Sequence, residues 1–222
     1  MIYLDNAATT YPKPFSVLET VYRANRKYAY NSGRGGYRES VQTAEKIFAV
    51  RDCLGRFFHC PEQNIVFANN CTTAVNTALK GLLKPGDHVL ISALEHNAVF
   101  RPIYKLAREG RITYDQVPYH PDPDRFLQNI RALEQPNTAM VAMLHASNVF
   151  GVVHPLGLVG DYCRQKGWLF VVDAAQSAGI LPIDMQAMHI SALCAPGDKH
   201  YYIVFKSVGV HQTLNTFDKY IE

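Results

Sequence analysis

The chain has 222 residues, of which 48% are hydrophobic and 18% charged, a composition typical of soluble globular proteins and long enough for one large domain with a buried core. Its formal net charge of +3 is small and spread along the chain, which argues against a nucleic-acid-binding or membrane-surface protein. No apolar run reaches the roughly 18 residues of a membrane-spanning helix, and no signal-peptide layout opens the chain, so we expect a cytoplasmic protein.

Two helices are predicted first, near residues 14–29 and 38–58, and the second carries an apolar stripe. The stripe consists of Val41, Ala44, Ile47, Phe48, Leu54 and Phe58. After them, short apolar runs alternate with helical segments. The predicted strands are 65–68, 88–92, 112–117, 139–145 and 168–173, and the predicted helices are 74–83, 97–109, 123–134 and 156–166. This alternation predicts an α/β fold, a mostly parallel sheet with helices on both faces.

The five cysteines and nine histidines are scattered along the chain. They form neither a C-x-x-C nor an H-E-x-x-H motif, and no other metal-ligand spacing is present. We therefore expect reduced thiols and no metal site.

Polar residues follow the first two predicted strands, at the edge where open parallel sheets bind ligands. Thr72 and Thr73 stand where a helix begins, so they are either an anion site suited to a phosphate or a simple helix cap. His96 lies just past the strand 88–92, where it is either a structural histidine or a flat ring that stacks on a ligand.

The later strands are also followed by polar residues. Asn148 is either a ligand contact or a turn residue. Asp173 ends a buried strand, with Gln176 in the next turn, and it either caps a helix or needs a buried partner such as a pyridinium N–H. Lys199 then follows a Gly-Asp pair. Taken together, these groups predict a site for a phosphorylated pyridine aldehyde held on a lysine.

Seven segments carry a family resemblance, in family order and at family spacing over residues 1–199. They are YLDNAATTYPKP (3–14), NSGRGGYRES (31–40), FANNCTTAVNTAL (67–79), ALEHNAV (93–99), LHASNVFGVVHPL (144–156), VVDAAQSAGILPID (171–184) and APGDK (195–199). The chain resembles the class V aminotransferases of PLP fold type I, in the cysteine desulfurase and selenocysteine lyase branch. The resemblance implies a cofactor-binding large domain over 15–199, with residues 1–14 lining the site.

The cofactor implied by this resemblance is pyridoxal 5'-phosphate (PLP). Its binding residues would be Thr72, Thr73, His96, Asn148, Asp173, Gln176 and Lys199. Thr72 and Thr73 would bind the phosphate, and His96 would stack on the pyridine ring.

Lys199, Asp173 and His96 are the implied catalytic residues. Lys199 would hold the cofactor as a Schiff base, and Asp173 would keep the ring nitrogen protonated. Asn148 and Gln176 would contact the ring region, Gln176 at its phenolic oxygen. The implied substrate is cysteine or a similar amino acid, and intact relatives would be homodimers with the DNAATT segment and the GRGGY loop partly lining the site across the interface.

The chain departs from the family pattern at two places. Asp198 stands where relatives have a histidine that contacts the phosphate, and its charge should weaken PLP binding about tenfold or more. Residues 200–222 do not match the glycine-rich loop that follows in relatives, so we expect an aberrant, possibly out-of-frame tail. The C-terminal small domain and one strand of the sheet would then be missing.

The expected function is that of a PLP-dependent cysteine desulfurase-like protein, which converts L-cysteine to L-alanine and enzyme-bound sulfur. Because the family's nucleophilic cysteine and carboxylate-binding arginine follow Lys199 in relatives, we expect this activity to be impaired. The alternatives are another class V lyase, aminotransferase or epimerase, or a non-catalytic truncated fragment. A measurement of PLP binding would distinguish the PLP-dependent enzymes from a fragment that binds no cofactor.

Overall fold

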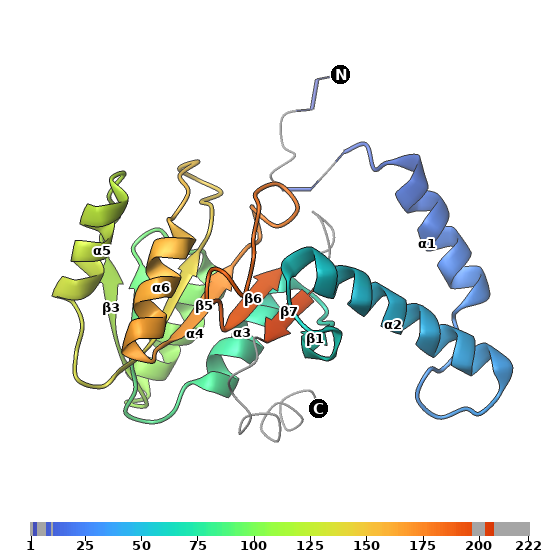
Figure 1. Ribbon diagram of the computed structural model, residues 1–222, viewed down its shortest axis with the longest axis horizontal. Helices are drawn as coiled ribbons and strands as arrows, with labels where there is room; N and C mark the ends of the chain where they lie inside the picture. The colour runs from blue at the N-terminus through green and yellow to red at the C-terminus, as the bar shows by residue number, and fades with distance from the viewer. Residues whose placement is uncertain (1, 4–7, 10, 197–202, 207–222) are drawn as a thin grey trace.

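The computed structural model describes residues 2–3, 8–9, 11–196 and 203–206. Within them, seven strands form one sheet in the order β1-β7-β6-β5-β4-β2-β3, with helices on both faces (Figure 1). The strands are β1 (Ile65–Val66), β2 (His88–Ser92), β3 (Thr113–Val117), β4 (Thr138–Leu144), β5 (Leu169–Asp173), β6 (Ala192–Ala195) and β7 (Ile203–Lys206). Strands β2 to β6 are parallel and β7 is antiparallel to both of its neighbours, so the predicted mostly parallel α/β sheet is confirmed.

The helices lie close to their predicted positions. They are α1 (Phe15–Lys27), α2 (Arg38–Phe58), α3 (Cys71–Leu82), α4 (Asn97–Arg108), α5 (Pro123–Ala132) and α6 (Leu156–Lys166). Local sequence explains several boundaries. Asp122 caps α5 by accepting hydrogen bonds from two backbone N–H groups, and Pro123 occupies the first helical position. Gly167, at a φ of 71°, ends α6 in the left-handed region.

Alternate strand residues face two separate apolar cores. Val89, Ile91 and Ala142 belong to the core that α3 and α4 cover. Leu90 and Val141 belong to the opposite core, which α5, α6 and the C-terminal end of α2 cover. This period of two, with both faces apolar, is the reason that the strand sequences read as continuous hydrophobic runs.

The apolar stripe predicted along α2 is buried only at its C-terminal end. Leu54 and Phe58 lie in the core, whereas Val41 and Phe48 are exposed. Helix α1 has no buried residue and stands apart from the sheet, joined to it through α2 (Figure 1).

The prediction that the sheet lacks a strand after Lys199 is wrong. Residues Ile203–Lys206 form β7, which pairs with β6 on one side and β1 on the other. The β-branched and aromatic run that looked out of place has the composition of a strand, and the gap between β6 and β1 gives it two partners. Strand β6 was also missed, because its short Ala-Leu-Cys-Ala sequence has little β propensity.

Two further features of the described residues concern membranes and metal ions. None of the helices in the described ranges has both the length and the apolar character needed to cross a bilayer. Within the same ranges, no group of three or more His, Cys, Asp or Glu residues is arranged to hold a metal ion.

Candidate functional site

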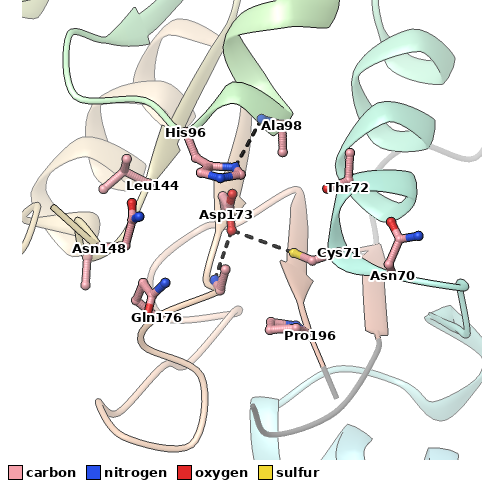
Figure 2. Close-up of a pocket in the computed structure, with 12 residues that line it drawn as sticks. Asn70, Cys71, Thr72, His96, Ala98, Leu144, Asn148, Asp173, Gln176 and Pro196 are labelled. Atoms are coloured by element: carbon pink, nitrogen blue, oxygen red, sulfur yellow. Dashed lines mark hydrogen bonds between the residues drawn. The ribbon is translucent and has the colours of Figure 1, made fainter. Parts of the chain in front are cut away.

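A cavity of about 260 Å³ lies at the carboxyl ends of the parallel strands, just below the roughly 300–1,000 Å³ of common ligand pockets (Figure 2). Its walls come from the turns after β2, β4, β5 and β6 and from the start of α3. The lining residues are Asn70, Cys71, Thr72, His96, Ala98, Leu144, Ala146, Asn148, Asp173, Ala175, Gln176 and Pro196. Five of the seven residues that the sequence singled out for binding therefore line one cavity.

Asp173 is the acidic residue of this lining, and its side chain is almost fully enclosed, with 4% of the residue exposed. Its Oδ1 accepts a hydrogen bond from the backbone N–H of Ala175 at 2.9 Å and from the thiol of Cys71 at 3.8 Å (Figure 2). Residues 174–177 form a turn and no helix begins there, so Asp173 is not a helix cap. A buried carboxylate of this kind is stabilised by donors and by a cationic partner.

His96 combines the two roles that the sequence left open. Its Nδ1 accepts a hydrogen bond from the backbone N–H of Ala98 at 3.1 Å, which caps α4. The same ring lines the cavity near Asp173 (Figure 2). Because Nδ1 is an acceptor here, the neutral ring carries its proton on Nε2, and the cap fixes the ring's orientation.

The two threonines at the start of α3 occupy different places. Thr72 lines the cavity in the first turn of the helix. Thr73 is not among the lining residues, and its backbone N–H donates to Oδ1 of Asn70 at 2.7 Å. Asn70 is thus the helix cap, which corrects the reading of a threonine cap. The helix N-terminus still presents its positive end to the cavity at Thr72.

Asn148 and Gln176 reach the cavity from two loops (Figure 2). Asn148 lies in the turn after β4, where Ser147 Oγ accepts from the backbone N–H groups of Val149 and Phe150. Asn148 can therefore be both a turn residue and a ligand contact. Gln176 lies in the turn that follows Asp173.

Other residues that the sequence singled out fall outside the described ranges or are not part of the cavity wall. Lys199 and Asp198 are outside the described residues, and the last described residue before them, Pro196, borders the cavity. Much of the DNAATT segment is also outside the described ranges. The GRGGY loop is described over 33–37 and is not part of the cavity wall in this single chain.

Sequence reasoning missed Cys71 and Glu95. Cys71 is the first residue of α3, and its thiol contacts Asp173. Glu95 Oε1 accepts hydrogen bonds from the Ser92 hydroxyl and from the Leu144 backbone N–H. Burial, together with the negative charge of Asp173, raises the pKa of Glu95 to about 8. A charged residue in the short turn after a buried strand was the signal that could have identified Glu95.

Two buried histidines are linked to Asp173 through backbone hydrogen bonds. The backbone N–H of His145 donates to the carbonyl of Asp173, and the backbone N–H of His154 donates to the carbonyl of His145. The ring of His154 packs against those of Tyr119 and Phe126. Burial lowers the pKa of both histidines to about 4, so both are neutral at pH 7.

Comparison with known proteins identifies the family. The family model described as Aminotransferase class-V matches residues 2–202. The chain belongs to the class V aminotransferase family. Its resemblance to this family, noted from seven sequence segments, is thereby confirmed.

Individual members of the class V aminotransferase family give the same result. The cysteine desulfurase IscS of Shewanella baltica (strain OS223) is 33% identical over 209 residues, which cover 90% of this chain and 50% of that protein. The apo structure of a cysteine desulfurase from Thermococcus onnurineus NA1 has a TM-score of 0.85 at 27% identity, covering 96% of this chain and 55% of that one. SspA in complex with cysteine has a TM-score of 0.81 at 26% identity, covering 92% and 60%. The chain spans about half the length of the curated relatives it matches.

The residues of the cavity fit PLP, the cofactor associated with class V aminotransferases. A helix N-terminus with a hydroxyl suits a phosphate, and a flat imidazole suits a pyridine ring. The enclosed Asp173 carboxylate suits a protonated ring nitrogen, because such a charge inside the protein is stabilised by a cationic partner.

Proposed function

We propose that this chain binds PLP in the cavity at the strand ends and belongs to a cysteine desulfurase-type enzyme that acts on cysteine or a similar small amino acid. The observation that carries the proposal is the enclosed Asp173 beside the start of α3 and the ring of His96. The likeness to IscS proteins and to SspA in complex with cysteine supports the choice of substrate. A homodimer and a cytoplasmic location belong to the same proposal.

Each residue has a separate task in this proposal. Thr72 and the N-terminus of α3 bind the phosphate, and His96 stacks on the ring. Asp173 holds a proton at the ring nitrogen, aided by the Cys71 thiol and the Ala175 N–H that fix its carboxylate. Asn148 and Gln176 orient the polar substituents of the ring.

When bound, PLP supplies an electron sink for the substrate's Cα. The amine of Lys199 is proposed to anchor the cofactor and to move the proton at that carbon. Sulfur transfer also needs a thiolate and a cation for the substrate carboxylate, which the resemblance assigns to residues beyond Lys199. We therefore expect PLP binding from the residues up to Lys199, whereas alanine release from L-cysteine depends also on the thiolate and the cation.

The proposal is tested by trapping the cofactor. Incubation with PLP followed by borohydride should fix the cofactor on Lys199, which peptide mass mapping detects. Asp173→Asn should weaken PLP binding about tenfold or more, because hydrogen bonds to charged groups contribute about 1.5–3 kcal/mol. The matched control is Asp52→Asn, a surface change on α2 that should leave PLP binding unchanged.

Two results would contradict the assignment of Lys199 and Asp173 to the PLP site, and a third concerns the expectation for alanine release. Labelling that persists in Lys199→Ala would place the cofactor on another lysine. Equal PLP dissociation constants for Asp173→Asn and the unmodified chain would remove Asp173 from the site. Substantial alanine release, abolished by Lys199→Ala, would show that residues of this chain complete the sulfur chemistry.

A further inference from the structure

Glu95 joins the ends of two strands that border the cavity. Its Oε1 accepts a hydrogen bond from the hydroxyl of Ser92, the last residue of β2, at 2.5 Å. The same oxygen accepts from the backbone N–H of Leu144, the last residue of β4, at 2.9 Å. Leu144 lines the cavity, and so does His96, the next residue after Glu95. One carboxyl group therefore connects two of the cavity walls.

A negative charge on Glu95 would be poorly stabilised. Its Oε2 is buried and has no hydrogen-bond partner among the residues that the structure describes. Asp173 is in register with Leu144 on the adjacent strand, so a second carboxyl lies one strand away. Burial and the charge of Asp173 both raise the pKa of Glu95, to about 8. Two buried carboxyls this close differ in protonation, because ionising both costs more than ionising one.

Among the titratable groups around Glu95, Asp173 is the acid whose negative charge repels an ionised Glu95. On its own segment, Glu95 is followed by His96. Just past β4, His145 follows Leu144, and burial keeps its ring neutral at pH 7. Around Asp173 lie the thiols of Cys71 on α3 and Cys194 on β6, and burial raises the pKa of the Cys194 thiol. Neither His145 nor either thiol supplies a cation that would stabilise an ionised Glu95 near neutral pH.

We propose that Glu95 is a protonated positioning residue, which joins the ends of β2 and β4 so that Asp173 carries the negative charge at the cavity. When Glu95 loses its proton, repulsion from Asp173 and the unpaired oxygen weaken the link between the two strands. His96 and Leu144 then lose their fixed places relative to Asp173. The consequence for PLP rests on the proposed function, whereas the link and its proton are properties of the chain alone.

The first experiment uses the chain without cofactor. Glu95→Gln replaces the acid with a neutral amide that keeps an oxygen acceptor. In the folded chain Glu95 keeps its proton up to about pH 8, whereas its ordinary pKa is 4.5, so the stability that it contributes is fully present below pH 4.5 and is lost as the pH rises from 4.5 to about 8. The urea midpoint of the wild-type chain should fall over this range, and that of Glu95→Gln should fall less. Glu109→Gln, an exposed change at the end of α4, should follow the wild type.

The second experiment measures PLP binding near neutral pH. Glu95→Ala removes the link and should weaken PLP binding about tenfold, as expected for two lost hydrogen bonds, whereas Glu95→Gln should bind like the wild type. Parallel urea profiles for wild type and Glu95→Gln would overturn the proposal, and so would wild-type PLP affinity in Glu95→Ala. If no variant, wild type included, binds PLP, the proposed function fails, while the urea profiles still decide the role of Glu95.

Discussion

The two buried histidines behind the site make the chain sensitive to acid. His154 is 1% exposed, and neither ring nitrogen has a hydrogen-bond partner among the described residues. Because burial disfavours the charged ring, its pKa falls to about 4 from an ordinary 6.5. Between pH 6.5 and about 4, the unfolded chain therefore binds a proton on His154 that the folded chain does not. The stability that neutral His154 contributes is present above pH 6.5 and is lost as the pH falls through about 4.

Replacing His154 should reduce this acid sensitivity. His154→Phe removes the titrating group and keeps a ring against Tyr119 and Phe126. Between pH 6.5 and 4 the free energy of unfolding of the wild type should fall by about 3 kcal/mol more than that of the variant, as a shift of this size implies. Urea titrations across this interval measure the difference. His120→Phe, at a less buried position, is the control, and equal slopes for His154→Phe and wild type would contradict the prediction.

At the residue scale, the sequence located most of the site because its residues follow strands. Thr72 and His96 lie a few residues after a strand and Asp173 is the last residue of one, and a sheet of mostly parallel strands brings such positions together. The helix start and the family resemblance assign both Thr72 and Thr73 to the phosphate, and the structure places only Thr72 in the cavity lining. Glu95 was missed because its role depends on the Leu144 N–H, which comes from a distant strand.

At the scale of the elements, α6 packs closely against the segment before β6. A Cβ on Gly160 would overlap the Met188 carbonyl oxygen, which is backbone and cannot easily move. At Gly157, in the same helix, such a Cβ would have no described atom within 4 Å beyond its own helix backbone and chain neighbours. The two glycines are therefore a matched pair, one required by packing and one not.

The pair gives opposite expectations for alanine. Gly160→Ala should lower the free energy of unfolding by about 1–3 kcal/mol, the usual cost of overpacking a core. Gly157→Ala should leave stability unchanged or raise it by up to about 1 kcal/mol, because alanine favours the helix. Thermal and urea unfolding of both variants measure this. Equal loss in both would show that α6 does not approach Met188 as closely as described.

The elements themselves were predictable where local pattern and tertiary context agree. The strand expected at 88–92 is found as His88–Ser92, because a continuously apolar run is a reliable signal in a two-sided sheet. Strand β6 has small residues that form a strand only because β5 and β7 flank it. Likewise the N-terminal part of the α2 stripe, including Val41 and Phe48, is amphipathic in sequence but has no covering element in the described chain.

At the scale of the whole molecule, α1 and α2 expose a large apolar surface. Its members are Phe15, Val17, Leu18, Val21, Tyr22, Val41, Phe48, Val50 and Phe57. A second cavity, of about 610 Å³, opens beside α2 and is bordered by Ala178, Gly179, Ala195 and Pro196. Apolar surface of this extent is characteristic of interfaces and of aggregation-prone proteins.

The chain as given should therefore self-associate with rising concentration. Phe48→Lys should reduce this association, because it places a charge at the centre of the α2 surface. Tyr104→Lys, which alters an exposed aromatic residue on α4, is the control and should associate like the wild type. Sedimentation velocity over a range of concentrations measures both. A wild-type chain that stays monomeric throughout would contradict the prediction.

The position of β7 has a consequence for the order in which the molecule folds. Within the described residues, the two-residue β1 pairs with β7 and with no other strand. Strands β2 to β6 pair with neighbours that are closer in sequence than β1 is to β7, so they close shorter loops, whereas β1 must wait for residues much further along the chain. During synthesis from the N-terminus, the centre of the sheet can form before Ile203–Lys206 has been made. The first strand in the sequence is thus the last to enter the sheet.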